Sequence, residues 1–260
     1  MTEQSLLVEK AAGIAVVTIN RPQKGNAWTK EMYREMANIQ RQLHSDPEVR
    51  VIILTGAGES FFCAGVDLGV LAQVDANFIL QELQAYQEIN TGWERHSRPV
   101  IAAINGLVVG SGLELALAAD IRLAADTAKF SINEVKLGIN PDMGGTQRLT
   151  RVVGPSQAKR LILTGDTIDA QEAARIGLVD LVVPAASLME ETRKIAGRIA
   201  GNPPVAINLA KKAINLAGET GLQHGLLFEQ IASAYCFTTE DKQEAIRAIQ
   251  VKGIPQFKGR

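Results

Sequence analysis

The feature that most constrains the fold is an apolar run that leads into small residues and a carboxylate, at residues 101–114 (IAAINGLVVGSGLE). Residues 100–105 carry almost no polar side chains, which is typical of a strand covered on both faces. Gly110 and Gly112 then flank Ser111. Because glycine has no Cβ, this turn allows the backbone to pass close to a ligand or to another chain segment.

A helix is expected to begin near Ser111, because Leu113, Ala116 and Leu117 recur at helical spacing. Glu114 lies in the first turn of this helix. An acid at that place complements the positive end of the helix dipole, which is an ordinary structural role. Taken alone, the pattern therefore favours a structural role for Glu114 over a chemical one.

Composition bounds the class of protein. With 260 residues, 46% of them hydrophobic, the chain is long enough for one large core or for a core with a small appended region. A formal net charge of -1 gives no reason to expect a nucleic-acid partner. No window approaches the roughly 20 apolar residues of a membrane span, and the first ten residues lack the apolar core of a signal peptide.

The two cysteines, Cys63 and Cys236, lie far apart and form no metal-ligand spacing with the three histidines. We therefore expect no metal site. Free cysteines favour a reducing compartment, so a cytoplasmic location is predicted.

The N-terminal half alternates strands with helices. Residues 14–19 and 49–55 are rich in β-branched residues and predict strands, and a helix is expected to begin at Thr29. Residues 56–67 are expected to form a glycine-rich loop, and residues 68–96 a helix that ends before the central strand. Strand and helix in alternation indicate an α/β core.

The alternation continues to about residue 195. Residues 121–125 and 178–183 predict further strands, and Asp169 with an acid three positions later predicts a capped helix start. Beyond that point only helical periodicity remains. We therefore predict a core at 1–195 and a C-terminal helical region at 196–260.

The C-terminal helices carry more apolar surface than a thin appendage buries alone. Large apolar residues recur there at helical spacing, namely Ile207, Ala210, Ile214, Leu226, Phe228, Ile231 and Tyr235. Such a surface predicts contact with another subunit.

Several motifs in order resemble the crotonase, or enoyl-CoA hydratase/isomerase, superfamily. They are NRP at 20–22, FCAGVD at 62–67, AAINGLVVGSGLELALAADIRLA at 102–124, FSINEVKLGINPDMGGTQRL at 130–149 and TGDTIDAQEAARIGLVDLVVP at 164–184. The resemblance covers practically the whole chain. It implies a ββα spiral core, a C-terminal helical trimerisation region, and a homotrimer or a homohexamer made of two trimers.

The resemblance also implies the chemistry. Members bind acyl-CoA thioesters without a further cofactor, as in fatty acid β-oxidation, and stabilise an enolate-like thioester oxygen with two backbone N–H groups. Position by position, these donors match Val66 and Ser111. Many relatives carry glycine where Ser111 stands, so its hydroxyl either narrows the site or offers one more hydrogen bond.

Two glutamates of the hydratases match Glu114 and Glu134. The implied reaction is the reversible addition of water across the 2,3 double bond of an enoyl-CoA, with Glu114 as the base towards water and Glu134 as the acid towards Cα. Without the resemblance, the sequence favours a solvated loop acid over a catalytic role for Glu134.

Asp142 leaves an alternative open. Dienoyl-CoA isomerases of the superfamily carry a catalytic aspartate at this position, so double-bond isomerisation by Glu134 and Asp142 is the second hypothesis. An ordinary turn or helix cap explains Asp142 equally well. A trimeric binding protein without catalytic activity is the third hypothesis.

The resemblance places the CoA moiety near basic residues. Arg21 and Lys24 follow the first predicted strand, and Phe257 with Lys258 matches a tail that often reaches the nucleotide of a neighbouring subunit. The other residues expected at the CoA ester are Ala64, Gly65, Asp67 and Gly110. The sequence gives no indication of the length, branching or rings of the acyl chain.

Overall fold

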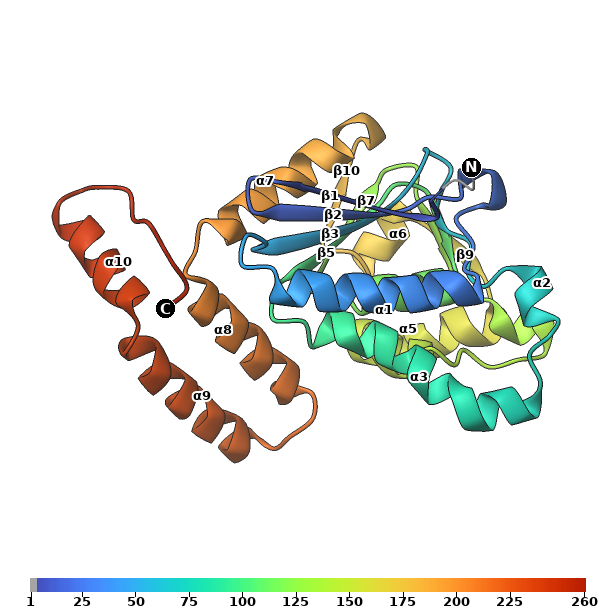
Figure 1. The fold of residues 1–260 in the computed structure, drawn as a ribbon. Coiled ribbons are helices and arrows are strands. Elements are labelled where there is room, and N and C mark those ends of the chain that lie inside the picture. Colours follow the sequence, from blue (N-terminus) through green and yellow to red (C-terminus); the bar gives the residue numbers. More distant parts are fainter. Residues whose placement is uncertain (1–3) are drawn as a thin grey trace.

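The computed structural model describes residues 4–260 and contains two mainly parallel sheets surrounded by helices (Figure 1). The larger sheet has the order β1-β2-β3-β5-β7-β10, and the smaller one has the order β4-β6-β8-β9. The strands of the larger sheet are β1 (Leu6–Ala11), β2 (Ile14–Ile19), β3 (Val51–Gly56), β5 (Val100–Ile104), β7 (Ile121–Ala125) and β10 (Leu181–Val183). Those of the smaller sheet are β4 (Phe61–Cys63), β6 (Leu107–Val109), β8 (Lys129–Ser131) and β9 (Thr167–Asp169).

The helices account for most of the remaining chain. The core carries α1 (Lys30–Ser45), α2 (Leu68–Leu71), α3 (Ala76–Glu94), α4 (Ser111–Leu117), α5 (Gly145–Thr164), α6 (Ala170–Arg175) and α7 (Leu188–Ala200). The C-terminal part carries α8 (Pro204–Ala217), α9 (Leu222–Phe237) and α10 (Glu240–Gln250). Short 3-10 helices are η1 (Pro22–Lys24), η2 (Glu134–Leu137) and η3 (Ala185–Ser187).

The chain winds as a spiral of two strands and a helix. Strands β3, β5 and β7 are successive neighbours in the larger sheet, while β4, β6 and β8 are successive neighbours in the smaller one. Each turn thus places one strand in each sheet before a helix returns the chain. All residues of β3 and β5 are buried, as their apolar sequences predict. The predicted α/β fold with a ββα spiral core is confirmed.

Three details of the core differ from the sequence prediction. Residues 56–67 are not wholly a loop, because β4 forms within them. Strand β1 was not predicted, since its outer residues are exposed and give no continuous apolar run. Residues 68–96 form two helices instead of one, because the Asp75 side chain accepts the N–H of Phe78 and starts α3 anew.

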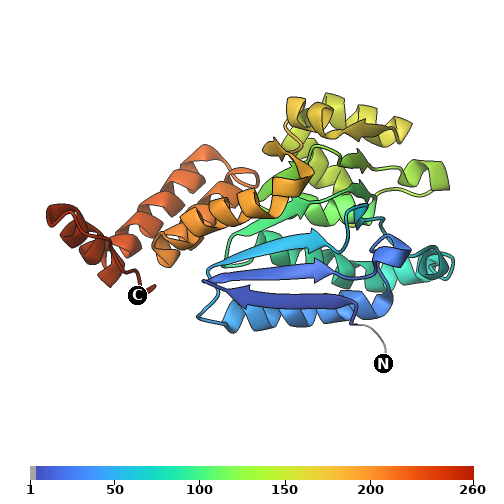
Figure 2. The same ribbon diagram turned by 90° about the horizontal axis from the view of Figure 1, so that it is seen from above.

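The C-terminal part begins later than the predicted division at 195/196. That position lies within α7, whose Thr192 and Ala196 are fully buried and which contacts β2, β3, β5 and β7. The helices that extend away from the body follow Asn202, as Figures 1 and 2 show. The division into a core and an oligomerisation region stays a prediction.

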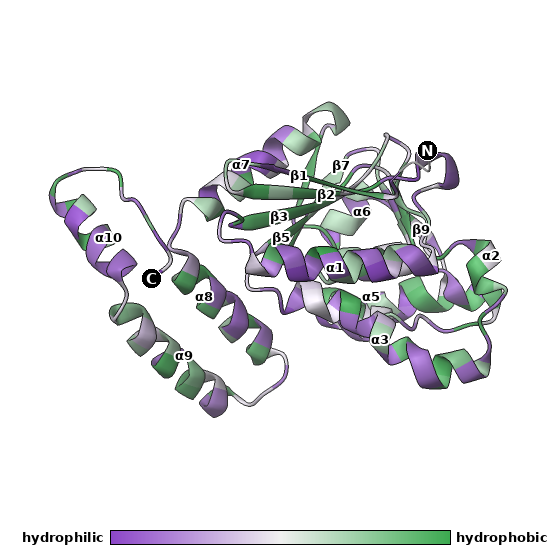
Figure 3. Cartoon of the chain, viewed as in Figure 1, coloured by the Kyte–Doolittle hydropathy of each residue, from purple (hydrophilic) through white to green (hydrophobic). Residues whose placement is uncertain are grey.

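Helix α9 presents a largely apolar surface to solvent, which Figure 3 shows as a green segment remote from the core. Six of its large apolar side chains are between 45% and 74% exposed: Leu222, Leu226, Leu227, Ile231, Tyr235 and Phe237. Helix α9 packs on α8, and none of its residues is buried in the single chain.

A buried ion pair fastens α8 to the core. Lys211 Nζ lies 2.8 Å from Asp120 Oδ2 and also donates to the carbonyl oxygens of Trp93 (3.1 Å) and Arg98 (3.3 Å). Asp120 Oδ2 in turn accepts the N–H of Val100 at 2.7 Å, where β5 begins. Burial raises the pKa of Asp120 and lowers that of Lys211, while each partner's charge opposes the shift of the other.

Replacing one member of this pair should destabilise the protein strongly. We expect Lys211→Met or Asp120→Asn to lower the free energy of unfolding by about 3–5 kcal/mol, because each leaves a buried partner without compensation. The double variant should recover much of that loss. Urea unfolding of all four proteins measures this, and additive losses would show that the two side chains act independently.

Candidate active site

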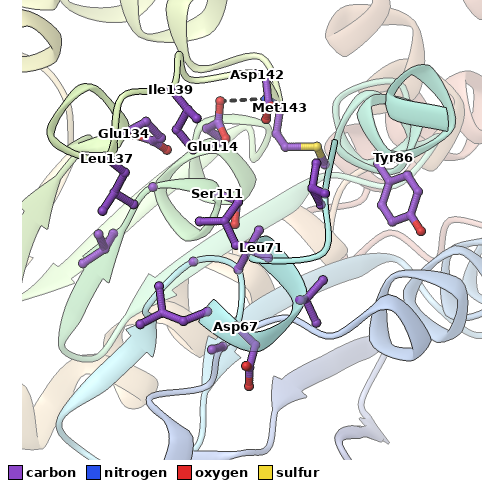
Figure 4. Close-up of a pocket in the computed structure, with 18 of the residues that line it drawn as sticks. Asp67, Leu71, Tyr86, Ser111, Glu114, Glu134, Leu137, Ile139, Asp142 and Met143 are labelled. Atoms are coloured by element: carbon purple, nitrogen blue, oxygen red, sulfur yellow. Dashed lines mark hydrogen bonds between the residues drawn. The ribbon is translucent and has the colours of Figure 1, made fainter. Parts of the chain in front are cut away.

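A cavity of about 610 Å³ opens between α2, α3 and the turn that joins β6 to α4 (Figure 4). Most of the predicted site residues line it: Lys24, Ala64, Gly65, Val66, Asp67, Gly110, Ser111, Glu114, Glu134 and Asp142. The structure therefore brings together residues that lie more than a hundred positions apart in the chain. Apolar side chains of α2 and α3, including Leu71, Phe78 and Ile79, form the opposite wall.

Glycines allow the turn at 110–112 to approach its neighbours closely. A Cβ on Gly112 would lie 2.4 Å from the carbonyl oxygen of Cys63, so only glycine lets α4 rest against β4. Gly110 has a φ of 53°, and a Cβ there would lie 2.8 Å from Glu134 Oε1. The close approach predicted for these glycines is confirmed, and it places Glu134 directly beside the turn.

Val66 and Ser111, whose backbone N–H groups the resemblance assigns to the thioester oxygen, line the cavity from adjacent segments. A Cβ on Gly65 would lie 3.7 Å from the Ser111 nitrogen, so the loop that carries Val66 and the start of α4 lie side by side. Among the backbone hydrogen bonds of residues 4–260, neither the N–H of Val66 nor that of Ser111 has an acceptor. The first N–H groups of a helix lack acceptors within it. The pair is thus free to hold an oxygen atom of a ligand.

Glu114 is held in a fixed orientation. Its Oε1 accepts the N–H of Met143 at 2.9 Å and the N–H of Gly145 at 2.7 Å, and the residue is only 1% exposed. A Cβ on Gly145 would lie 2.7 Å from Glu114 Oε1, so glycine is required there too. These contacts join α4 to the start of α5, and they leave Oε2 for other partners.

Glu134 and Asp142 complete a group of three acids around Ser111, which Figure 4 shows at one end of the cavity. Glu134 starts η2, and its buried Oε2 has no hydrogen-bond partner among residues 4–260. The carbonyl oxygen of Asp142 accepts the Gln87 side chain at 2.6 Å. Asp142 does not cap the next helix, because Gly144 holds the N-cap position of α5. The helix-cap interpretation of Asp142 is therefore wrong.

Burial raises the pKa values of all three acids, and the charges of neighbouring acids add to the rise for Glu114 and Glu134. Burial is the main cause for Glu114, whose pKa is raised to about 8. The negative charges of Glu134 and Asp142 raise this pKa further, whereas the hydrogen bonds from the N–H groups of Gly145 and Met143 lower it. Burial also raises the pKa of Glu134 and that of Asp142. Neighbouring carboxyls titrate as a unit, and the raised pKa of Glu114 means that this group retains a proton at neutral pH.

The basic residues differ in their positions. Lys24 lines the cavity. Arg21 is not among the lining residues; its guanidinium donates to the carbonyl oxygen of Ala27 (2.6 Å) and to Asp67 (3.3 Å). Asp67 caps α2 by accepting the N–H of Gly69. This hydrogen bond is the main cause that lowers the pKa of Asp67, and the hydrogen bond from Arg21 lowers it further. Arg21 and Asp67 thus brace the loop that carries Val66.

Phe257 and Lys258 do not approach this cavity within the chain. The backbone N–H of Lys258 donates to Asp241 of α10 at 2.6 Å, and the carbonyl oxygen of Phe257 accepts the Arg50 guanidinium at 2.7 Å. Their predicted role concerned a neighbouring subunit, and it stays a prediction.

Sequence reasoning missed Tyr33, which lines the cavity from α1. The buried face of that helix includes Met32 and Met36. Tyr33 stands three positions before Met36 and so lies on an edge of the same face, which is the signal that could have identified it.

The site combines N–H donors for an oxygen atom with carboxyl groups that can transfer protons. Two N–H groups aimed at one point stabilise an oxygen on which negative charge develops. A protonated carboxyl and a carboxylate beside them can deliver and remove protons. The arrangement therefore suits chemistry on the carbons next to a carbonyl group.

Comparisons with known proteins agree with this chemistry. A model of the enoyl-CoA hydratase/isomerase family matches residues 9–260. The chain is 41% identical over 265 residues to a short-chain-enoyl-CoA hydratase of Clostridium acetobutylicum, with 100% of both chains covered. It is 40% identical over 257 residues to a crotonyl-CoA hydratase of Syntrophomonas wolfei, with 99% of each covered.

Solved structures show the same fold. A crystal structure of an enoyl-CoA hydratase from Bacillus anthracis matches with a TM-score of 0.95 and 40% identity, covering 99% of this chain and 100% of the other. Among residues 4–260, no helix is long and apolar enough to cross a membrane.

The raised pKa of Glu114 predicts a pH-dependent contribution to stability. The folded protein holds a proton on this group that the unfolded chain releases above the ordinary value of 4.5, so stability should fall as the pH rises from about 4.5 to about 8. Glu114→Gln removes the effect. Relative to this variant, the wild type should lose up to about 5 kcal/mol across that range.

Urea unfolding at several pH values measures the difference. Glu229→Gln, which changes an exposed glutamate of α9, is the matched control and should follow the wild type. A constant difference between wild type and Glu114→Gln would contradict the raised pKa.

Proposed function

The chain belongs to the enoyl-CoA hydratase/isomerase family and is an enoyl-CoA hydratase, and on this premise we propose that Glu114 and Glu134 add water to the substrate in the cavity described. The observation that carries the proposal is the convergence of both glutamates with the free N–H groups of Val66 and Ser111 on one cavity. The thioester oxygen would accept those N–H groups.

The two glutamates would divide the proton transfers. Hydrogen bonds to a carboxylate oxygen favour the ionised form, and Glu114 Oε1 accepts two of them. The buried Oε2 of Glu134 lacks such a donor, which favours its protonated form. In the reacting complex, Glu114 therefore takes a proton from water as it adds to Cβ, and Glu134 delivers one to Cα.

The raised pKa of Glu114, about 8, favours a proton on this carboxyl at neutral pH in the free protein, and burial raises the pKa of Glu134 as well. The proposed division therefore requires that the proton resides on Glu134 once the substrate is bound. A water molecule between the carboxyls would pass the proton from one to the other.

The N–H groups of Val66 and Ser111 would stabilise the enolate-like state. Backbone dipoles fixed by the fold do not need to reorganise as charge develops. Gly112 and the braced loop around Asp67 hold the two donors in place. The reaction would need no further cofactor, because coenzyme A is part of the substrate. Lys24, which lines the cavity, would bind one of its phosphates.

Asp142 supports a second candidate activity. Its carboxyl lines the cavity beside Glu134, so a proton removed by one acid and returned by the other would shift a double bond without adding water. Incorporation of heavy oxygen from water separates the two reactions. A panel of short, long, branched and cyclic enoyl-CoAs identifies the acyl chain.

We expect Glu114→Gln and Glu134→Gln each to lower hydration by about 100-fold or more, because the amide keeps the shape but cannot transfer the proton. Binding of a saturated acyl-CoA should change little. Steady-state kinetics and isothermal titration measure these quantities. Near-normal turnover in either variant would contradict the mechanism, and loss of activity in Asp142→Asn alone would favour isomerisation.

We further propose that the protein assembles as a homotrimer or as two such trimers. The exposed apolar surface of α9 supports this, because soluble monomers rarely leave such a face wet. In such an assembly Phe257 and Lys258 would lie near the CoA of a neighbouring subunit. The free thiols Cys63 and Cys236 support a cytoplasmic location.

Light scattering should therefore give a mass of three or six chains. Ile231→Glu places a charge on the exposed apolar face of α9 and should shift the protein towards smaller species. Leu163→Glu, at an exposed leucine of α5, is the matched control and should leave the mass unchanged. A wild-type monomer at micromolar concentration would exclude the proposed assembly.

A further inference from the structure

We propose that the hydroxyl of Ser111, oriented by the hydroxyl of Tyr33, donates a third hydrogen bond to the thioester oxygen beside the two backbone N–H groups. The inference rests on the proposed function, because it concerns the same oxygen. It adds a catalytic residue, Ser111 through its side chain, and a positioning residue, Tyr33.

The two hydroxyls are buried and have no hydrogen-bond partner. Tyr33 is 5% exposed and Ser111 is 7% exposed, and neither Tyr33 Oη nor Ser111 Oγ forms a hydrogen bond among residues 4–260. Both residues line the cavity. The Ser111 hydroxyl is the largest influence that opposes the burial-induced rise in the pKa of Tyr33, as expected for adjacent groups.

The tyrosine ring is fixed by its neighbours. It stacks on Trp28 with ring centroids 4.9 Å apart, and Tyr86 packs against it edge-on at 5.0 Å. The backbone of Trp28 donates to the carbonyl oxygen of Gly65 (2.8 Å) and accepts the N–H of Asp67 (2.9 Å). Trp28 thus holds both the ring of Tyr33 and the loop that presents the Val66 N–H.

The hydroxyl protons of Tyr33 and Ser111 outnumber the acceptors that the two groups offer each other. Two hydroxyl groups carry two protons, and bonding to one another uses only one of them. If Tyr33 donates to Ser111 Oγ, the proton of Ser111 still needs an acceptor. A buried donor without an acceptor costs free energy, and such a group in a native structure calls for a specific reason.

The position of Ser111 Oγ supplies that reason. A Cβ on Gly65 would lie 3.7 Å from Ser111 Oγ and equally 3.7 Å from the Ser111 nitrogen. The hydroxyl therefore lies on the side of the residue that faces the Val66 loop, where the thioester oxygen would sit. An oxygen that gains negative charge there is the acceptor that the hydroxyl lacks.

The test combines Ser111→Ala, Tyr33→Phe and the double variant. Ser131→Ala is the matched control, because Ser131 Oγ of β8 is also buried and unpartnered but Ser131 does not line the cavity. Two quantities are measured: kcat for hydration, and the pKa at which a bound 3-oxoacyl-CoA forms its enolate, followed by near-ultraviolet absorbance. Unfolding midpoints confirm that each variant is folded.

Ser111→Ala should lower kcat by about 10- to 100-fold and raise the enolate pKa by about one unit or more, with KM little changed. Tyr33→Phe should lower kcat by about three- to tenfold in the wild-type background, and it should not lower kcat further in the Ser111→Ala background. Ser131→Ala should match the wild type. A Ser111→Ala variant that behaves as Ser131→Ala overturns the proposal, and losses that multiply in the double variant overturn the role of Tyr33.

The enolate measurement needs no hydration. Absence of hydration with every enoyl-CoA would refute the proposed function, whereas a normal enolate pKa in Ser111→Ala would refute only the third hydrogen bond.

Discussion

The site depends on one close contact, that of Gly112 with the carbonyl oxygen of Cys63. Because no side chain separates them, α4 lies directly against β4, the strand that precedes the loop of Val66. A methyl group at this contact would push the two segments apart. The separation of the Val66 and Ser111 N–H groups is therefore set by the absence of a side chain, which is a firmer constraint than any hydrogen bond between the segments.

The same packing makes the acids unusual. Water would solvate three neighbouring carboxyls and keep them ionised, but the cavity replaces much of that water with apolar side chains of α2 and α3. Removing ionised carboxyls from water costs free energy. Two N–H groups that donate to Glu114 offset part of this cost, and a retained proton lowers it further by removing one of the negative charges. A protonated acid beside a carboxylate is thus the least costly state of this cavity near neutral pH.

Much of this was accessible from the sequence, and the exceptions have physical reasons. The apolar run at 100–105 and the glycines around Ser111 indicate a buried strand and a close approach, because few side chains tolerate either environment. By contrast, β1 is half exposed and β4 has only three residues, so neither leaves a periodic pattern. The spacing of Tyr33 from Met36 indicates that it lies on the inner face of α1, but only the tertiary packing of α1 shows that this part of the face borders the cavity.

Likewise, Glu134 and Asp142 are polar residues in loops by every local criterion. Only the spiral topology shows that their loops return to the start of α4, and resemblance to a family was needed to single them out beforehand. The pairing of Arg21 with Asp67 was also hidden, because the two residues are joined by tertiary structure alone.

The ion pair between Lys211 and Asp120 has a consequence for the order of events during synthesis. Asp120 lies just after α4 and is made long before Lys211, so until α8 leaves the ribosome its carboxylate has the N–H of Val100 but not the ammonium group that pairs with it. The segment that bears the site therefore reaches its full stability only when α8 arrives. The stability of the site thus depends on a helix that contributes none of the residues lining the cavity.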